Sequence, residues 1–324
     1  MSLSLKQISK RFDDKWVLRD VSFEANPGEI LGIFGESSAG KSTLIEIAAG
    51  KLAPTAGSIE YNGRDITNLS CADRKFQFPS LSNQSIWRAL FRSNTASELS
   101  DGEGQMLALE TALKTASGVL LLDNSFCDMD KSMRGTAFAR LREIVAAREL
   151  TVICASNDFE EILLACDRVA VLTGGEIAQI GKPQHVYENP ESSSVASIVE
   201  RNNLFAARRL TSSKSEMPEY QTLDGSHRLF AQKHERTTLA PINQNVILGI
   251  RPEQISLSFG ASFPEDNLLK ATVTSITFLG ATTVVGFDCD GLSLTALVLK
   301  VIGLNIGDEC MVSLPPERIQ IFNQ

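Results

Sequence analysis

Near the N-terminus, a loop with two glycines and a lysine sets the strongest limit on how this chain folds. Residues 35–42 read Gly-Glu-Ser-Ser-Ala-Gly-Lys-Ser and fit the pattern G-x-x-x-x-G-K-[ST]. The sequence predicts a short apolar strand before this loop, at 29–34, and a helix after it that Gly50 closes. In that order of elements, backbone N–H groups surround a bound phosphate. The flanking elements argue against a flexible turn that fits the pattern by chance.

The residue types in this loop predict binding of ATP with Mg²⁺. Lys41 would neutralise phosphate charge, and Ser42 would contact the metal ion. A second apolar strand ends in Asp123, a carboxylate that supplies another magnesium contact beside the loop. The predicted nucleotide-binding residues of the loop are Gly35, Glu36, Ser37, Ser38, Ala39, Gly40, Lys41, Ser42 and Thr43.

The pattern along the chain indicates two domains. With 324 residues, the chain exceeds the usual length of a single domain. Apolar strands separated by helix-length segments predict an α/β domain over 1–200 with a mixed, largely parallel sheet. From residue 203 onward, short strands alternate with Gly, Pro and Asn, which predicts a small all-β barrel over 201–324. The apolar strands in question lie at 29–34, 118–122, 151–155 and 168–172.

Composition excludes several classes of protein. The net charge of −8 and the lack of a dense Lys/Arg run argue against a nucleic-acid partner. The six cysteines show no C-x-x-C spacing, so we expect neither disulfides nor a zinc site. The N-terminal segment meets charge too early for a signal peptide, and the longest apolar stretch, 292–304, is too short to cross a bilayer. We therefore expect a cytoplasmic protein that reaches a membrane only through a partner.

The order of these motifs resembles the ATP-binding cassette family over residues 1 to about 200. Residues 35–43 match the Walker A loop, 119–123 match the Walker B strand, and 99–103 lie where the LSGGQ signature belongs. The resemblance implies the P-loop NTPase fold of a cassette, with a helical subdomain inserted before the signature.

The resemblance also assigns roles outside the phosphate loop. Gln77 is implied as the Q-loop residue, a further magnesium contact, and Asp130 as the D-loop aspartate. Phe12, with Trp16 as second choice, is implied as the aromatic that stacks on adenine. The alternative for Phe12 is a place in the hydrophobic core.

Cassettes of this family pair head to tail, so that each signature contacts the nucleotide of the other subunit. The resemblance therefore implies a second cassette as partner, in a homodimer or heterodimer, with Ser100, Asp101, Gly102 and Glu103 acting in trans. Residues 174–190 resemble the stretch after the cassette in importers for spermidine, iron(III) and sulfate, and 247–253 resemble the start of their TOBE domain. Transmembrane permease subunits, and indirectly a solute-binding protein, are thus implied, with the chain on the inner face of the plasma membrane.

Two substitutions depart from the family in the catalytic groups. Asn124 stands where the family has the glutamate that activates water, and Asn157 stands where it has the switch histidine. A neutral amide orients water but cannot take its proton, and general-base catalysis is worth roughly 10² to 10⁴ in rate. The sequence therefore predicts that hydrolysis is weak or lost.

The signature and the segment before it also differ. Asp101 replaces a glycine and would repel the partner's γ-phosphate, although Ser100 to Glu103 equally well form a helix capping box. Only residues 78–98 separate Gln77 from the signature, so the helical subdomain is shortened. Within it, 86–91 is either a reduced permease-docking face or a helix packed on the core.

Two hypotheses remain for the function. One is a degenerate cassette that binds ATP and hydrolyses it poorly as part of an importer, and the other is a fully active transport ATPase. A general P-loop kinase or GTPase is disfavoured, because the signature-like and D-loop segments would have no role in it. For the C-terminal barrel, binding of a small oxyanion, dimerisation and packing on the cassette all stay open.

Overall fold

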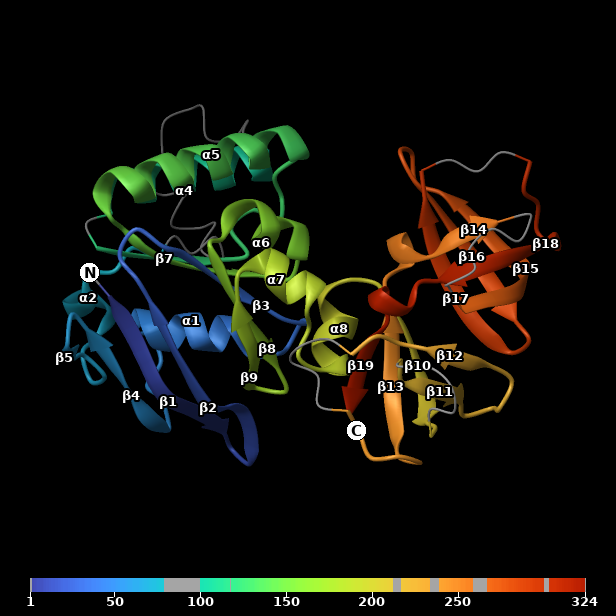
Figure 1. Cartoon of the computed structure of the whole chain (residues 1–324). Coiled ribbons are helices and arrows are strands. Elements are labelled where there is room, and N and C mark those ends of the chain that lie inside the picture. Colours follow the sequence, from blue (N-terminus) through green and yellow to red (C-terminus); the bar gives the residue numbers. More distant parts are fainter. Residues whose placement is uncertain are drawn as a thin grey trace. The chain divides into compact units, whose positions relative to one another are not determined.

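The computed structural model places the chain in two compact units, Met1–Pro190 and Glu191–Gln324 (Figure 1). This division falls before the boundary near residue 200 that the sequence indicates, so helix α8 (Ser193–Val199) belongs to the second unit. The described residues are 2–78, 100–116, 118–211, 217–233, 239–258, 267–299 and 303–323.

A five-stranded sheet with the order β6-β7-β3-β8-β9 forms the centre of the first unit. The first four strands are parallel, and β9 joins β8 in the antiparallel direction. Every residue of β3 and β7 is buried, which explains their nearly continuous apolar runs in the sequence. The prediction of a mixed, largely parallel sheet is confirmed. The strands are β3 (Ile30–Phe34), β6 (Val119–Asp123), β7 (Thr151–Ser156), β8 (Arg168–Thr173) and β9 (Glu176–Gly181).

The register of this sheet brings three strand ends to one edge. Phe34 of β3 pairs with Ser156 of β7, and Asp123 of β6 pairs with Ala155. Parallel strands present their carboxyl ends at the same edge, where ligands of open α/β sheets bind. The loops that follow β3, β6 and β7 therefore lie next to one another.

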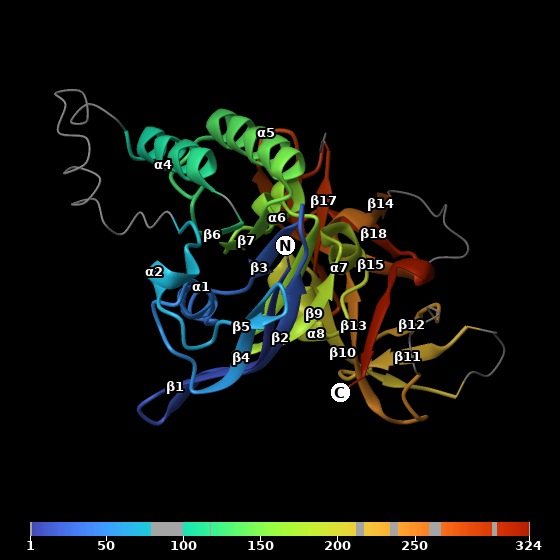
Figure 2. The same ribbon diagram turned by 90° about the vertical axis from the view of Figure 1, so that its left-hand side faces the viewer.

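Helices cover both faces of the sheet. Figure 1 shows α1 (Lys41–Ala49) on one face and both α5 (Lys131–Arg148) and α6 (Phe159–Ala165) on the other. Helix α4 (Asp101–Thr115) packs beside α5 in both views (Figures 1 and 2). Two short helices, α2 (Cys71–Arg74) and α7 (Pro183–Glu188), complete the unit as described. The core of α5 comes from Ala137, Phe138, Leu141, Ile144 and Val145, which recur at helical spacing.

A second, antiparallel sheet in the first unit has the order β2-β1-β4-β5. Its strands are β1 (Leu3–Phe12), β2 (Lys15–Ala25), β4 (Ala56–Tyr61) and β5 (Arg64–Asp65). Leu3, Leu5 and Ile8 of β1 are buried in the same hydrophobic cluster as Leu31 and Ile33 of β3. This sheet therefore packs on the central one, and the long hairpin β1–β2 reaches the phosphate loop.

The second unit consists of two five-stranded antiparallel sheets, with the orders β12-β11-β10-β13-β19 and β14-β18-β15-β16-β17. Side chains from both sheets form one hydrophobic cluster. The predicted all-β character of this part is confirmed, with helix α8 preceding it. The strands are β10 (Asn203–Arg209), β11 (Glu219–Thr222), β12 (Arg228–Phe230), β13 (Asn245–Ile250), β14 (Ser256–Ser258), β15 (Asn267–Phe278), β16 (Thr283–Cys289), β17 (Leu292–Val298), β18 (Glu309–Leu314) and β19 (Gln320–Asn323), and short 3-10 turns lie at Pro252–Gln254 and Pro316–Arg318.

No helix among the described residues has both the length and the apolar character needed to cross a membrane.

Candidate functional site

The phosphate loop connects β3 to α1, as the sequence predicts, and its glycines are required by close contacts. A Cβ at Gly35 would clash with the backbone carbonyl oxygen of Leu172 in β8. Gly40 has a φ of +104°, and a Cβ there would lie 2.8 Å from Leu18 Cδ2. Crowding excludes larger residues at both positions, and at Gly40 the left-handed conformation excludes them as well. The strand β2 therefore fixes the shape of the loop from one side.

No side chain among the described residues caps the N-terminus of α1. Gly40 is the N-cap of this helix and has no side chain to accept from its backbone N–H groups, and the first turn carries no acidic residue. Such an end binds an anion, because its N–H groups and the helix dipole both favour negative charge. Glu36, Ser37, Ser38 and Ser42 are exposed, Thr43 is partly buried, and Ala39 is buried against the core. The loop thus presents its polar residues to a ligand and anchors itself through Ala39.

Lys41 is held inside the loop. Its Nζ donates to the carbonyl oxygens of Gly35 and Glu36, each at 2.8 Å, and the residue is 5% exposed. Burial lowers the pKa of Lys41, while the nearby carboxylate of Asp123 acts in the opposite direction. A phosphate at the loop would supply the negative charge that this buried ammonium lacks.

Asp123 and Asn124 end strand β6 at the same edge. Asn124 has a φ of +45°, and its Nδ2 donates to Asp123 Oδ1 at 3.1 Å. Its backbone N–H donates to Ala155 O at 2.9 Å, which fixes the turn against β7. The amide therefore supports the carboxylate that is expected to contact magnesium, and it offers no group that could accept a proton from water.

Gln77 lies beside β6, and Asn157 follows the last residue of β7. Gln77 forms a short parallel bridge to β6, with hydrogen bonds of 3.0 Å to Val119 O and 2.8 Å from Leu121 N–H. Asn157 follows directly after β7 and is exposed. Asn157 therefore lies at the edge that carries the phosphate loop, whereas Gln77 pairs with Leu120, three residues before Asp123 in β6.

The described residues contain no cluster of three or more His, Cys, Asp or Glu that could hold a metal by itself. The predicted magnesium contacts, Ser42, Gln77 and Asp123, include one carboxylate. This donor set fits Mg²⁺, which keeps several waters and binds through one or two carboxylates together with substrate phosphates. The residues present therefore suit magnesium that arrives with a nucleotide.

Ser100 caps helix α4 in a capping box. Its side chain accepts from the Glu103 N–H at 3.3 Å, and Glu103 Oε2 accepts from the Ser100 N–H at 2.8 Å. These hydrogen bonds lower the pKa of Glu103. Asp101 is exposed at the first helical position, and Leu99 lies outside the described residues. The helix-capping interpretation is thus confirmed for Ser100 and Glu103, and the role of Asp101 in trans stays a prediction.

Gly102 is packed against the loop that follows β6. A Cβ at Gly102 would lie 2.8 Å from Asp128 O. In that loop, Asp130 caps helix α5 by accepting from the Met133 N–H at 2.8 Å. The segment predicted as the signature and the segment predicted as the D-loop are therefore in contact within one subunit.

Phe12 and Trp16 lie at the end of the β1–β2 hairpin and are 44% and 40% exposed. Lys10 lies over the Phe12 ring and Arg11 over the Trp16 ring. Phe12 is therefore not a core residue, which removes the alternative that the sequence left open. Adenine stacking on either ring stays a prediction.

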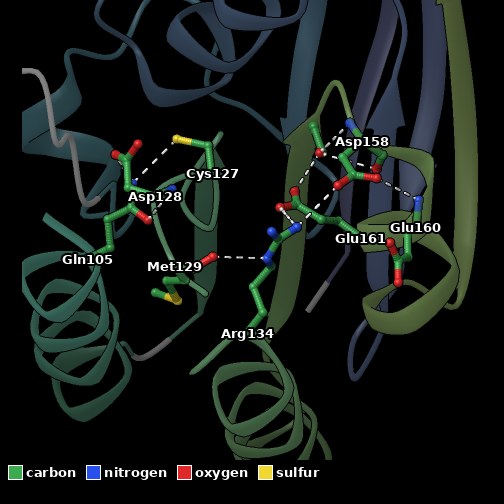
Figure 3. A network of polar contacts seen from close by, with 9 residues as sticks. Gln105, Cys127, Asp128, Met129, Arg134, Asp158, Glu160 and Glu161 are labelled. Carbon is green, nitrogen blue, oxygen red and sulfur yellow. Dashed lines mark hydrogen bonds and ion pairs between the residues drawn. The ribbon is translucent and has the colours of Figure 1, made fainter. Parts of the chain in front are cut away.

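Figure 3 shows a network of polar contacts that the sequence did not reveal. It joins Gln105 of α4, the loop after β6, Arg134 of α5 and Glu161 of α6. The sequence gives little indication of this network, because each of its residues alone has the pattern of a charged or polar residue on an exposed helix face. The segment 86–91, predicted as the remainder of the helical subdomain, lies outside the described residues.

Comparisons with known proteins agree with this geometry. Residues 18–85 match the ABC transporter family model, and residues 248–322 match the TOBE domain model. These matches, together with the relative described below, support an importer-type ATP-binding cassette ATPase with a C-terminal TOBE domain. The importer-type resemblance seen in the sequence is thereby confirmed, and so is the predicted cassette fold class.

Individual relatives show how far the likeness extends. The chain is 28% identical over 314 residues to the spermidine/putrescine import ATP-binding protein PotA of Trichormus variabilis, covering 86% of this chain and 82% of the relative. A nucleotide-free cassette from an ABC transporter matches with a TM-score of 0.55 and 20% identity, over 62% of this chain and 100% of that one. A bacterial Atm1-family ABC exporter with ATP bound matches with a TM-score of 0.51 and 20% identity, over 61% of this chain and 41% of that one. These structural matches show the fold.

Proposed function

We propose that this cassette protein is the ATP-binding subunit of an importer and binds Mg-ATP at the loop formed by residues 35–43. The observation that carries the proposal is the uncapped N-terminus of α1 beside the buried ammonium of Lys41. On binding, Lys41 exchanges its contacts with Gly35 O and Glu36 O for phosphate oxygens, and the α1 amides gain acceptors. Ser42 and Asp123 would hold the magnesium ion.

We further propose that hydrolysis by this subunit is weak. Asn124 orients water but accepts no proton, and its amide is engaged with Asp123. The position expected for the switch histidine is Asn157 at the exposed end of β7. The active-ATPase alternative is supported by the complete phosphate loop and by Asp123.

The partners follow from the proposal. A second cassette would meet the first turn of α4, where Ser100 to Glu103 lie, and permease subunits would bring the chain to the cytoplasmic face of a membrane. The curated relative is named for spermidine and putrescine import. These two solutes are therefore the first to test for uptake by the complete transporter.

Calorimetric titration of the full chain with Mg-ATP tests the proposal. We expect saturable binding that Lys41→Ala weakens at least roughly 100-fold, since charge-assisted contacts to phosphate are lost from a buried site. Lys51→Ala is the matched control, because Lys51 lies just after α1 and outside the loop. Equal affinity in Lys41→Ala and the unchanged protein would reject the site.

Steady-state turnover then separates the two versions of the function. We expect turnover by the purified chain near background at saturating Mg-ATP. Robust turnover that Lys41→Ala abolishes would establish the active-ATPase alternative instead.

A further inference from the structure

Arg134 joins the two loops that follow β6 and β7. From α5, its Nε donates to Met129 O at 3.2 Å, which lies in the loop after β6. Its Nη1 donates to Asp158 Oδ2 at 3.1 Å and to Glu161 Oε1 at 3.2 Å, beyond β7 (Figure 3). One planar guanidinium thus holds a backbone carbonyl and two carboxylates, a geometry that its fixed fork of donors permits.

Glu161 needs this cation. Its side chain is 6% exposed, and among the described residues Arg134 is the one cation within ion-pair distance of it. Burial raises the pKa of Glu161, and Arg134 opposes that shift. Because an unpaired buried carboxylate is costly, the position of Arg134 is tied closely to that of Glu161.

Glu161 in turn reaches the strand that borders the phosphate loop. Ser156 Oγ donates to Glu161 Oε2 at 2.6 Å, and Ser156 is 2% exposed. Ser156 is the last residue of β7, pairs with Phe34 of β3, and is followed by Asn157. A displacement at the end of β3 or at Asn157 therefore acts directly on the Glu161 carboxylate.

On its other side, the loop after β6 is clamped to α4. Gln105 Nε2 donates to Asp128 Oδ2 at 2.6 Å, and Gln105 Oε1 accepts from the Asp128 N–H at 3.1 Å. Gln105 is 3% exposed, and Gly102 packs on Asp128 O one turn earlier. The first turns of α4 therefore cannot shift independently of this loop.

We propose that Arg134 is a positioning residue that transmits occupation of the phosphate loop to the first turn of α4. The path runs from Ser156 through Glu161 and Arg134 to the loop after β6, and from Asp128 to Gln105. The inference rests on the proposed function for its trigger, since Mg-ATP is the ligand that would move the end of β3. It adds that the surface offered to a second cassette depends on the nucleotide held in the same subunit.

Hydrogen–deuterium exchange of the full chain with and without Mg-ATP tests the transmission, at a concentration where sedimentation shows a monomer. In the unchanged protein, we expect Mg-ATP to slow exchange in 35–49 and also in 100–110, the latter on the order of threefold to tenfold. In Arg134→Gln, we expect slowing to be confined to 35–49. The control Arg142→Gln removes an arginine of α5 whose side chain is 45% exposed and pairs with Asp167, outside the measured segment, and it should keep the slowing in 100–110.

Arg134→Lys separates positioning from simple charge compensation. A lysine keeps a positive charge opposite Glu161 but lacks the planar fork that also holds Met129 O. We expect Arg134→Gln to lower the unfolding midpoint, because it leaves Glu161 without its cation. We expect Arg134→Lys to restore that midpoint without restoring the slowing in 100–110. Recovery of both by lysine, or unchanged slowing in 100–110 for Arg134→Gln, would overturn the proposal.

Measurements with and without nucleotide distinguish a failure of this proposal from a failure of the proposed function. Absence of slowing in 35–49 in the unchanged protein would reject Mg-ATP binding, whatever Arg134 does. Without nucleotide, Ser156→Ala should raise exchange in 100–110 when Arg134 is present and should add nothing in the Arg134→Gln background. An effect of Ser156→Ala that is the same in both backgrounds, or none in either, would overturn the transmission through Arg134.

Discussion

Replacing Asn124 with glutamate tests whether this position alone limits hydrolysis. The glutamate would lose the 3.1 Å hydrogen bond to Asp123, worth roughly 1.5 kcal/mol for a half-exposed bond to a charged group. A second carboxylate about 5 Å from Asp123 adds about 1–3 kcal/mol of repulsion at an effective dielectric between 80 and 20. The φ of +45°, which asparagine tolerates best, adds roughly 1 kcal/mol. The nucleotide-free chain should therefore lose about 3.5–5.5 kcal/mol of unfolding free energy.

Two companion variants separate these contributions. Asn124→Gln keeps the amide and adds no charge, but it places a residue other than asparagine at the positive φ. The unfolding free energy should therefore fall by about 1–2 kcal/mol. Asn124→Asp keeps the short side chain and introduces the charge. Urea unfolding without nucleotide measures the first unit's stability in each variant, and the order of loss should be Gln, then Asp, then Glu.

Turnover gives the second measurement on the same proteins. A restored general base alone would raise the rate by roughly 10² or more. We expect a smaller gain in Asn124→Glu, since Asn157 and Asp101 are unchanged. A glutamate variant as stable as the starting protein would refute the structural reasoning, and a gain of roughly 10² or more would refute the claim that other positions also limit the reaction.

Three further variants test the capping box, the buried acid and the second unit. Ser100→Ala should cost about 1 kcal/mol by removing the cap of α4, and a thermal scan that matches the unchanged protein would contradict it. Burial raises the pKa of Glu161 in the folded protein above its ordinary value of 4.5. The stabilisation that this shift gives the folded protein is therefore complete below pH 4.5 and is lost as the pH rises through the folded-state pKa. Glu161→Gln should flatten this decline in unfolding free energy, and an unaltered pH profile would argue against it. Asn203→Ala removes hydrogen bonds to Ile250 O and to both backbone groups of Thr295, and should cost about 2–4 kcal/mol in urea unfolding; an unshifted midpoint would contradict it.

Sequence reasoning succeeded where the signal is local. The phosphate loop, its strand and its helix occupy a continuous stretch, so the apolar run of β3, the glycines and the closing Gly50 all appear in order. The capping box at Ser100 and Glu103 is equally local, because its two partners are three residues apart. Such patterns need no knowledge of what the rest of the chain does.

Other features depended on contacts between distant segments. The register of β1 on β2 is interrupted by irregularities, and Gln7 has a positive φ, so the alternation that marks a strand is obscured in β1. Arg134 and Glu161 are 27 residues apart, and Gln105 and Asp128 are 23 apart. Charged residues on helices are ordinarily solvated, so only the packing of α5 against α6 distinguishes this arginine from the exposed Arg140.

The proposed binding of nucleotide at the N-terminus of α1 would make the ligand part of the folding equilibrium of this protein. A ligand that binds only the folded chain at 100 times its Kd adds about 2.7 kcal/mol to the unfolding free energy. Gly40 supplies no side-chain cap to α1, and Lys41 is a buried cation. This stabilisation would therefore come from the ligand and not from the chain itself. The amount of intact protein in a cell should then follow the supply of ATP, because proteases remove chains in proportion to the time they spend unfolded.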